Sequence, residues 1–146
     1  MGTNVKFSIA ISFLLILNAI SFTAFAQKVN FKLTDLQNKT WAMQGLTDKT
    51  NDNEFANNKI KIYFNGEYMG AFEYYLSDSI VTVFDSTKVG MGNEGKYIIE
   101  RLIPNPQKSS ARQPGRISVF EIIELSSAKL VLRNVKQDYL LEYKAK

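Results

Sequence analysis

The chain has 146 residues, no cysteine, no histidine and a formal net charge of +4 at pH 7. Without Cys or His it can form no disulfide, Ser-His-Asp or Cys-His catalytic group, or His-based zinc site. The net charge is too small to favour nucleic acid as a partner.

The first 26 residues have the pattern of an export signal. A positive charge at Lys6 precedes an apolar run over Phe7–Ala19, and Ala24-Phe25-Ala26 is the small-x-small pattern that signal peptidase accepts. We therefore expect residues 1–26 to be a cleaved signal peptide and residues 27–146 to form one periplasmic or secreted domain. A retained membrane anchor is the alternative that the cleavage pattern disfavours. The absence of Cys excludes a lipoprotein.

The mature part divides into short β-type runs separated by turn residues. A short helical turn is expected over Phe31–Asn38, before the first strand. The expected strands are Thr40–Leu46, Lys59–Phe64, Glu67–Leu76, Ile80–Phe84, Lys96–Ile103, Arg116–Leu125, Lys129–Val135 and Tyr139–Lys144. Eight sequential strands with short links predict an all-β, antiparallel, up-and-down barrel, which leaves no exposed sheet edge. A sandwich would give a similar pattern.

Two hairpins indicate which side chains face the barrel interior. Asn65-Gly66 is a favoured two-residue turn, and the register that it sets continues the inner face to Glu73. A second turn at Ser126-Ser127 places Glu121 on the inner face in the same way. The two hairpins thus bring two carboxylates into the expected interior.

These inward carboxylates suggest a ligand site. A carboxylate inside a barrel needs a partner or water, so Glu73 and Glu121 could orient a polar or cationic group of a ligand. Two simpler explanations weigh more heavily: a bulge that turns the side chain outward, or an internal ion pair with Arg101 or Lys96. The candidate cavity wall consists of Glu73, Tyr75, Glu121, Tyr139 and Tyr143.

Three further patterns are interpreted as loops. Gly90–Gly95 matches the dinucleotide pattern G-x-G-x-x-G, but a strand follows it where a helix is needed. The acidic residues of Thr47–Asn58 lack the Gly and the closing Glu of a calcium loop. Pro104–Arg116 carries three cations and could meet an anionic partner, although an exposed polar loop is the preferred interpretation. No catalytic residue, metal or cofactor is expected.

Two segments resemble bacterial lipocalin-like domains. Leu36–Trp41 resembles the opening of these proteins, with Lys39 in place of a usual Gly, and Ile117–Leu125 with Lys129–Arg133 resembles their late hairpin. The resemblance implies an eight-stranded barrel with a small hydrophobic cavity. It also implies a structural role for Trp41 at the closed end of the barrel. The loop Thr47–Asn58 would form a lid over the open end.

The expected function is non-enzymatic binding of a small hydrophobic or amphipathic molecule in the barrel cavity. The alternative is a filled barrel that docks onto an envelope protein through residues 106–114 or an outer patch containing Tyr63, Tyr68 and Ile122. An outer-membrane barrel is disfavoured because most expected strands are shorter than the about 9–11 residues needed to span. No integral membrane segment is expected after cleavage, and enzymatic carboxylate chemistry is less favoured than either binding hypothesis.

Overall fold

The computed structural model describes residues 29–104 and 115–146. Eight antiparallel strands form a closed barrel, in which each strand pairs with its neighbours in the chain and the last pairs with the first. They are β2 (Lys39–Met43), β3 (Asn51–Phe55), β4 (Lys59–Phe64), β5 (Glu67–Ser77), β7 (Tyr97–Leu102), β8 (Ile117–Leu125), β9 (Lys129–Asn134) and β10 (Leu140–Ala145). The expected all-β, eight-stranded up-and-down barrel is confirmed. The expected signal peptide lies outside the described residues.

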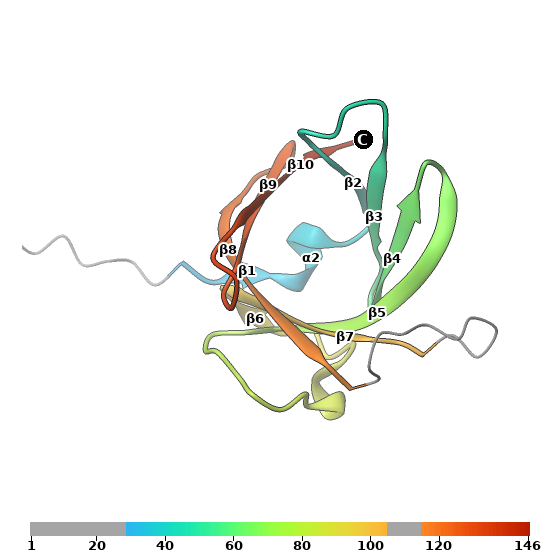
Figure 1. Cartoon of the computed structure of the whole chain (residues 1–146). Helices are drawn as coiled ribbons and strands as arrows, with labels where there is room; N and C mark the ends of the chain where they lie inside the picture. The colour runs from blue at the N-terminus through green and yellow to red at the C-terminus, as the bar shows by residue number, and fades with distance from the viewer. Residues whose placement is uncertain (1–28, 105–114) are drawn as a thin grey trace, which may run out of the picture.

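Short elements cover one end of the barrel. Helix α2 (Leu33–Leu36) lies across the ring of strands when the barrel is viewed along its axis (Figure 1), and both of its leucines are buried. The carboxylate of Asp35 accepts a hydrogen bond of 3.0 Å from the backbone N–H of Lys32, which stabilises the helix start. The expected helical turn is thus confirmed over Leu33–Leu36, whereas Phe31–Lys32 forms a short strand. Within the described ranges, no helix has the length and hydropathy to cross a bilayer.

A two-stranded ribbon ties the N-terminal segment to the barrel. Strand β1 (Phe31–Lys32) pairs with β6 (Glu94–Gly95), which continues almost directly into β7. The pattern Gly90–Gly95 is therefore followed by a strand and not by a helix. Gly95 is required here because a Cβ atom at this position would overlap the backbone of Ser77.

The eight strands are not the eight that the sequence predicts. Ile80–Phe84 is not a strand but part of a segment that runs outside the barrel ring next to η1 (Ser86–Lys88), as Figure 1 shows. Val81 and Phe84 of this segment cover the outer face of the sheet, where Phe84 packs against Tyr75 with ring centroids 5.2 Å apart. The apolar run thus reflects a second, smaller core outside the barrel.

The missing strand is β3, which lies in the predicted loop Thr47–Asn58. Four of its five residues, Asn51–Glu54, have low intrinsic β-propensity, but its outward carboxylates form ion pairs with lysines of neighbouring strands or of the C-terminal end. Glu54 forms an ion pair of 2.9 Å with Lys61, and Asp52 forms one with Lys146. Pairing across the sheet therefore supports a strand that composition alone disfavours.

A β-bulge reverses the expected inner face of β5. The Asn65-Gly66 turn forms with positive φ at both residues, as expected. Met69, however, has no pairing partner on β4, so the register shifts by one residue beyond it. As a result Phe72, and not Glu73, points into the barrel.

The β8–β9 hairpin is shifted as well. The backbone N–H of Ser126 donates to the carbonyl of Lys129 at 2.9 Å, so the turn centres on Ser127-Ala128, one residue later than expected. A further bulge at Ile123 leaves that residue unpaired. The shifted turn keeps Leu125 on the inner face, so the bulge at Ile123 is what turns Glu121 to the outer face of the barrel.

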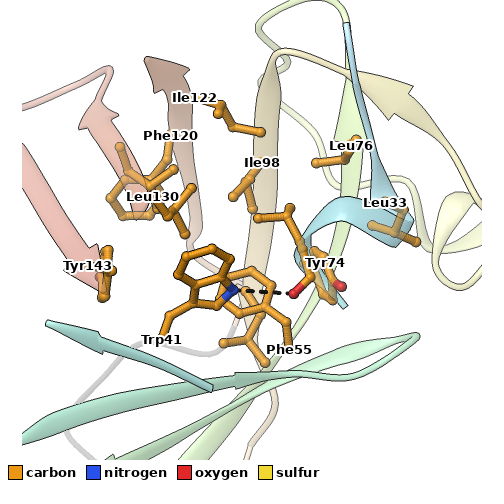
Figure 2. Close-up of a cluster of buried hydrophobic side chains, with 13 residues drawn as sticks. Leu33, Trp41, Phe55, Tyr74, Leu76, Ile98, Phe120, Ile122, Leu130 and Tyr143 are labelled. Carbon is orange, nitrogen blue, oxygen red and sulfur yellow. Dashed lines mark hydrogen bonds between the residues drawn. The ribbon is translucent and has the colours of Figure 1, made fainter. Parts of the chain in front are cut away.

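The barrel interior next to α2 is tightly packed around Trp41 (Figure 2). Its indole Nε1 donates a hydrogen bond of 3.2 Å to the carbonyl of Leu36, which ties β2 to the helix. Phe55 and Tyr74 meet edge to face at 5.4 Å, and the hydroxyl of Tyr74 donates to the carbonyl of Ala56 at 2.8 Å. This end of the barrel therefore combines dense apolar packing with satisfied polar groups.

Candidate ligand-binding cavity

A cavity of about 530 Å³ lies inside the barrel, in the half away from α2. Its wall includes Met43, Phe64 and Leu102, which lie at the strand ends remote from the helix. Further apolar side chains come from the middle of the strands, among them Ile62, Phe72 and Leu132. The volume falls within the range of about 300–1,000 Å³ that is usual for small-molecule sites.

Strand β3 contributes two amides to this apolar wall. Because alternate residues of a strand share a face, Asn51 and Asn53 point inward together with Phe55. The Nδ2 of Asn53 donates a hydrogen bond of 3.4 Å to the hydroxyl of Tyr143 on β10. The Oδ1 atoms of both asparagines are buried and accept no hydrogen bond from the part of the chain that the structure describes.

Glu100 places a carboxyl group in the same wall. It lies on β7, between Tyr74 of β5 and Ser118 of β8. Within residues 29–104 and 115–146, no side chain or backbone group forms a hydrogen bond or ion pair with it. Burial raises the pKa of this carboxyl to about 8, so the group is mostly protonated at neutral pH.

The carboxyl of Glu100 and the amide of Asn53 both act on Tyr143. Burial is the main cause of the raised pKa of the Tyr143 phenol, and the carboxyl of Glu100 raises that pKa further once it is ionised. The hydrogen bond with Asn53 opposes these effects. The three side chains therefore form one polar cluster on an otherwise mainly apolar wall.

Of the five expected wall residues, the structure places Tyr143 in the cavity wall. The expectation for Tyr75 is wrong, because its side chain is fully buried in the small core outside the barrel. Tyr139 precedes β10 and is 42% exposed, and it is not part of the wall. An aromatic residue near the right strand is therefore not enough to place a side chain in the lumen.

The expectation that Glu73 and Glu121 face the interior is also wrong. The carboxylate of Glu73 forms an ion pair of 2.6 Å with Arg101 on the outer face. Glu121 pairs with Lys96 at 3.1 Å and with Arg133. Both simpler explanations contribute: bulges turn the carboxylates outward, and Arg101 and Lys96 are their partners, although outside the barrel and not within it.

Sequence reasoning missed three polar wall residues. Asn51 and Asn53 are in a segment expected to be a loop. Without a strand, the alternation of side-chain direction could not be used to predict that both point inward. Glu100 lies in a strand in which each face carries one charged residue, Glu100 on one and Arg101 on the other. Only the register with β5 decides between them, because it sets Phe72 and Leu102 opposite each other on the inner face.

The cues for other functions are only partly present. Tyr63 and Tyr68 stack edge to face at 5.8 Å on the outside, but Ile122 is buried and cannot join them in a patch. Residues 106–114 lie outside the described residues. The acidic side chains of Thr47–Asn58 do not form a metal site: in the described ranges, no group of three or more His, Cys, Asp or Glu side chains could hold a metal ion.

Comparisons with family models, with curated proteins and with solved structures find no match to this chain.

Proposed function

We propose that this domain is an exported binding protein that holds a small amphipathic molecule in the barrel cavity, as the resemblance to lipocalin-like domains implies. The observation that carries the proposal is the cavity of about 530 Å³ with a mainly apolar wall and one polar cluster. Small-molecule sites have this composition, in which apolar walls supply affinity and a few polar groups fix orientation.

The apolar wall can supply most of the binding free energy. Burial of each methylene group is worth about 0.8 kcal/mol, so an eight-carbon chain gains about 6 kcal/mol before the costs of association. Loss of translational and rotational freedom offsets a large part of this gain. A short chain alone would therefore bind weakly, and the polar cluster would have to add affinity and select the head group.

Native mass spectrometry tests the proposal. The full chain is expressed in a bacterial host, and the protein recovered from the envelope is sprayed under native and denaturing conditions. We expect a reproducible small-molecule adduct that is lost on denaturation. A clean apo mass, combined with no uptake of added amphipathic probes, would contradict the proposal.

Two tryptophan variants of the same strand sharpen this experiment. Ile62→Trp places a bulky side chain in the cavity, whereas Lys61→Trp places it on the outer face. We expect the first to abolish the adduct and the second to retain it. Retention of the adduct in Ile62→Trp would mean that the molecule binds outside the cavity.

A second candidate function is docking onto an envelope protein, and it rests on the β4–β5 hairpin. There Tyr68, which meets Tyr63 edge to face, is half exposed, at 50%. Exposed apolar side chains that gather at one hairpin are typical of interaction sites. A clean apo mass together with loss of a partner on substitution of Tyr68 by Ser would favour this function over the first.

A further inference from the structure

The polar part of the cavity wall contains hydrogen-bond acceptors that no group in the described part of the chain fills. The Oδ1 atoms of Asn51 and Asn53 are buried and unpaired within the described part of the chain. The carboxyl of Glu100 has no partner there either, although it lies in the same wall. Buried polar atoms are normally satisfied, so a set of open acceptors calls for a molecule that brings donors.

The charge distribution points the same way. Among the described residues, no Lys or Arg lines the cavity. On the outer face, by contrast, Glu54, Glu73 and Glu121 each have a Lys or Arg within ion-pair distance. An anionic head group in the cavity would meet the open acceptor oxygens of the two asparagines, with no Lys or Arg in that wall to pair with it.

We propose that the cavity selects an amphipathic amine, whose ammonium head lies against Glu100 and the amides of β3 and whose apolar body fills the rest of the lumen. This inference rests on the proposed function. An ammonium group has three N–H donors and a positive charge, and it therefore matches both the open acceptors and the carboxyl group.

Proton release gives the inference a second observable. In the free protein Glu100 is mostly protonated below pH 8, whereas an alkylammonium ion beside it favours the carboxylate. The amine keeps its charge throughout this range, since an alkyl ammonium such as that of Lys has a pKa of about 10.4. Binding at pH 6–7 should therefore release close to one proton, and the affinity should rise about tenfold from pH 6 to pH 7 and level off above pH 8.

The other groups that face Glu100 do not titrate in this range. Tyr74 on β5 and Tyr143 on β10 have pKa values raised by burial, so both phenols stay neutral. Ser118 on β8 and Asn53 on β3 carry no charge. A change in binding between pH 6 and pH 8 therefore reports on Glu100.

Three probes with the same chain length test the head group. Octylamine, 1-octanol and octanoate are titrated into the full chain, and binding is measured by calorimetry in buffers of different ionisation enthalpy. We expect octylamine to bind at least tenfold more tightly than the other two at pH 8, with release of close to one proton at pH 6.5. Octanoate should bind most weakly.

The variant Glu100→Gln keeps the shape and removes the charge, and Glu73→Gln on the outer face is its matched control. We expect Glu100→Gln to weaken octylamine binding at least tenfold, to leave 1-octanol binding unchanged and to abolish proton release. Glu73→Gln should behave like the wild type. Because the probe ranking and the proton release are measured on the wild-type chain, the test holds even if a variant folds poorly.

The outcomes separate this inference from the proposed function. If 1-octanol or octanoate binds as tightly as octylamine, or if Glu100→Gln keeps the amine preference, the amine inference is overturned while cavity binding stands. If none of the three probes binds to the folded wild-type protein, cavity binding fails and the amine inference fails with it.

Discussion

The two halves of the barrel interior are built from the same strands, but they differ in packing and in polar satisfaction. Next to α2, Trp41 and Tyr74 are fully buried and both of their polar atoms form hydrogen bonds. In the other half the strands enclose a cavity of about 530 Å³, with open acceptors on Asn51 and Asn53. Stability is therefore concentrated at one end, which leaves the other end free to bind.

The carboxyl groups repeat this contrast between inside and outside. Burial opposes ionisation of Glu121, but hydrogen bonds from Lys96 and Arg133 outweigh it and lower the pKa of its carboxyl. At Glu100 burial acts without any such partner and raises the pKa to about 8. The same residue type is thus a charged structural group on the outer face and a neutral group in the cavity. Binding sites commonly carry groups that lower stability in the free protein.

The largest expected effect is the loss of the packed end. Trp41→Ala removes the central side chain of the core and its hydrogen bond to Leu36, and we expect it to lower the free energy of unfolding by about 3–5 kcal/mol. Chemical denaturation of the full chain measures this change. Met43→Ala in the cavity wall is the control, and it should cost less than half as much because its surroundings are already hollow. Equal costs would contradict a division between a packed and a hollow half.

The next effect is a pH dependence of the free energy of unfolding that arises from Glu100. Its pKa is about 8 in the folded chain and is raised from 4.5, so the folded state binds more protons than the unfolded state between these values. Stability is therefore fully present below pH 4.5 and decreases as the pH rises toward 8. We expect a loss of about 2–3 kcal/mol between pH 5 and pH 7, measured as the change in the free energy of unfolding.

The outer carboxylates do not contribute in that range. Glu54, Asp85 and Glu121 have lowered pKa values, so their contribution is lost only as the pH falls below about 4.5. Glu100→Gln should therefore remove most of the slope between pH 5 and pH 7. An unchanged slope in this variant would show that Glu100 is ionised in the folded protein, and would weaken the contrast between the inner and outer carboxyl groups.

A third effect concerns the ribbon that ties the N-terminal segment to the closed end. Gly95→Ala would force a Cβ atom into the backbone of Ser77, and we expect a loss of about 1–3 kcal/mol in the free energy of unfolding. Glu94→Ala, an exposed neighbour in the same strand, is the control. Thermal melting of both variants measures the difference. A melting temperature for Gly95→Ala equal to that of the control would mean that the ribbon shifts without cost.

The fold class could be predicted from the sequence because it depends on the number and spacing of strands. The count of eight was correct although Ile80–Phe84 is not a strand and β3 was missed. Both errors have the same cause: local composition does not show what a segment packs against. An apolar run can cover the outside of a sheet, and a polar run such as Asn51–Phe55 can form a strand when its partners supply the pairing.

The cavity wall could not be predicted to the same extent, since side-chain direction depends on register. One bulged residue reverses the two faces of a strand. Because of the bulges at Met69 and Ile123, the side chains of Phe72 and Ile122 point into the barrel, and those of Glu73 and Glu121 point outward. Tyr143 lies in the wall as expected, on a strand that pairs without a bulge, and Glu100 was missed because its strand has a charged residue on each face.

The smallest expected effect is removal of an outer carboxylate. Glu73→Gln breaks the ion pair with Arg101, but both partners remain partly exposed. Pairs of this kind are worth about 0–1 kcal/mol, and salt screens them. Arg101 also keeps its hydrogen bond to Ser86 at 3.1 Å and its position over the ring of Phe84, so it is not left without contacts. We therefore expect a loss below about 1 kcal/mol that shrinks further at high salt, with octylamine binding unchanged. A loss as large as that caused by Trp41→Ala would show that the outer face, and not the packed end, holds the barrel together.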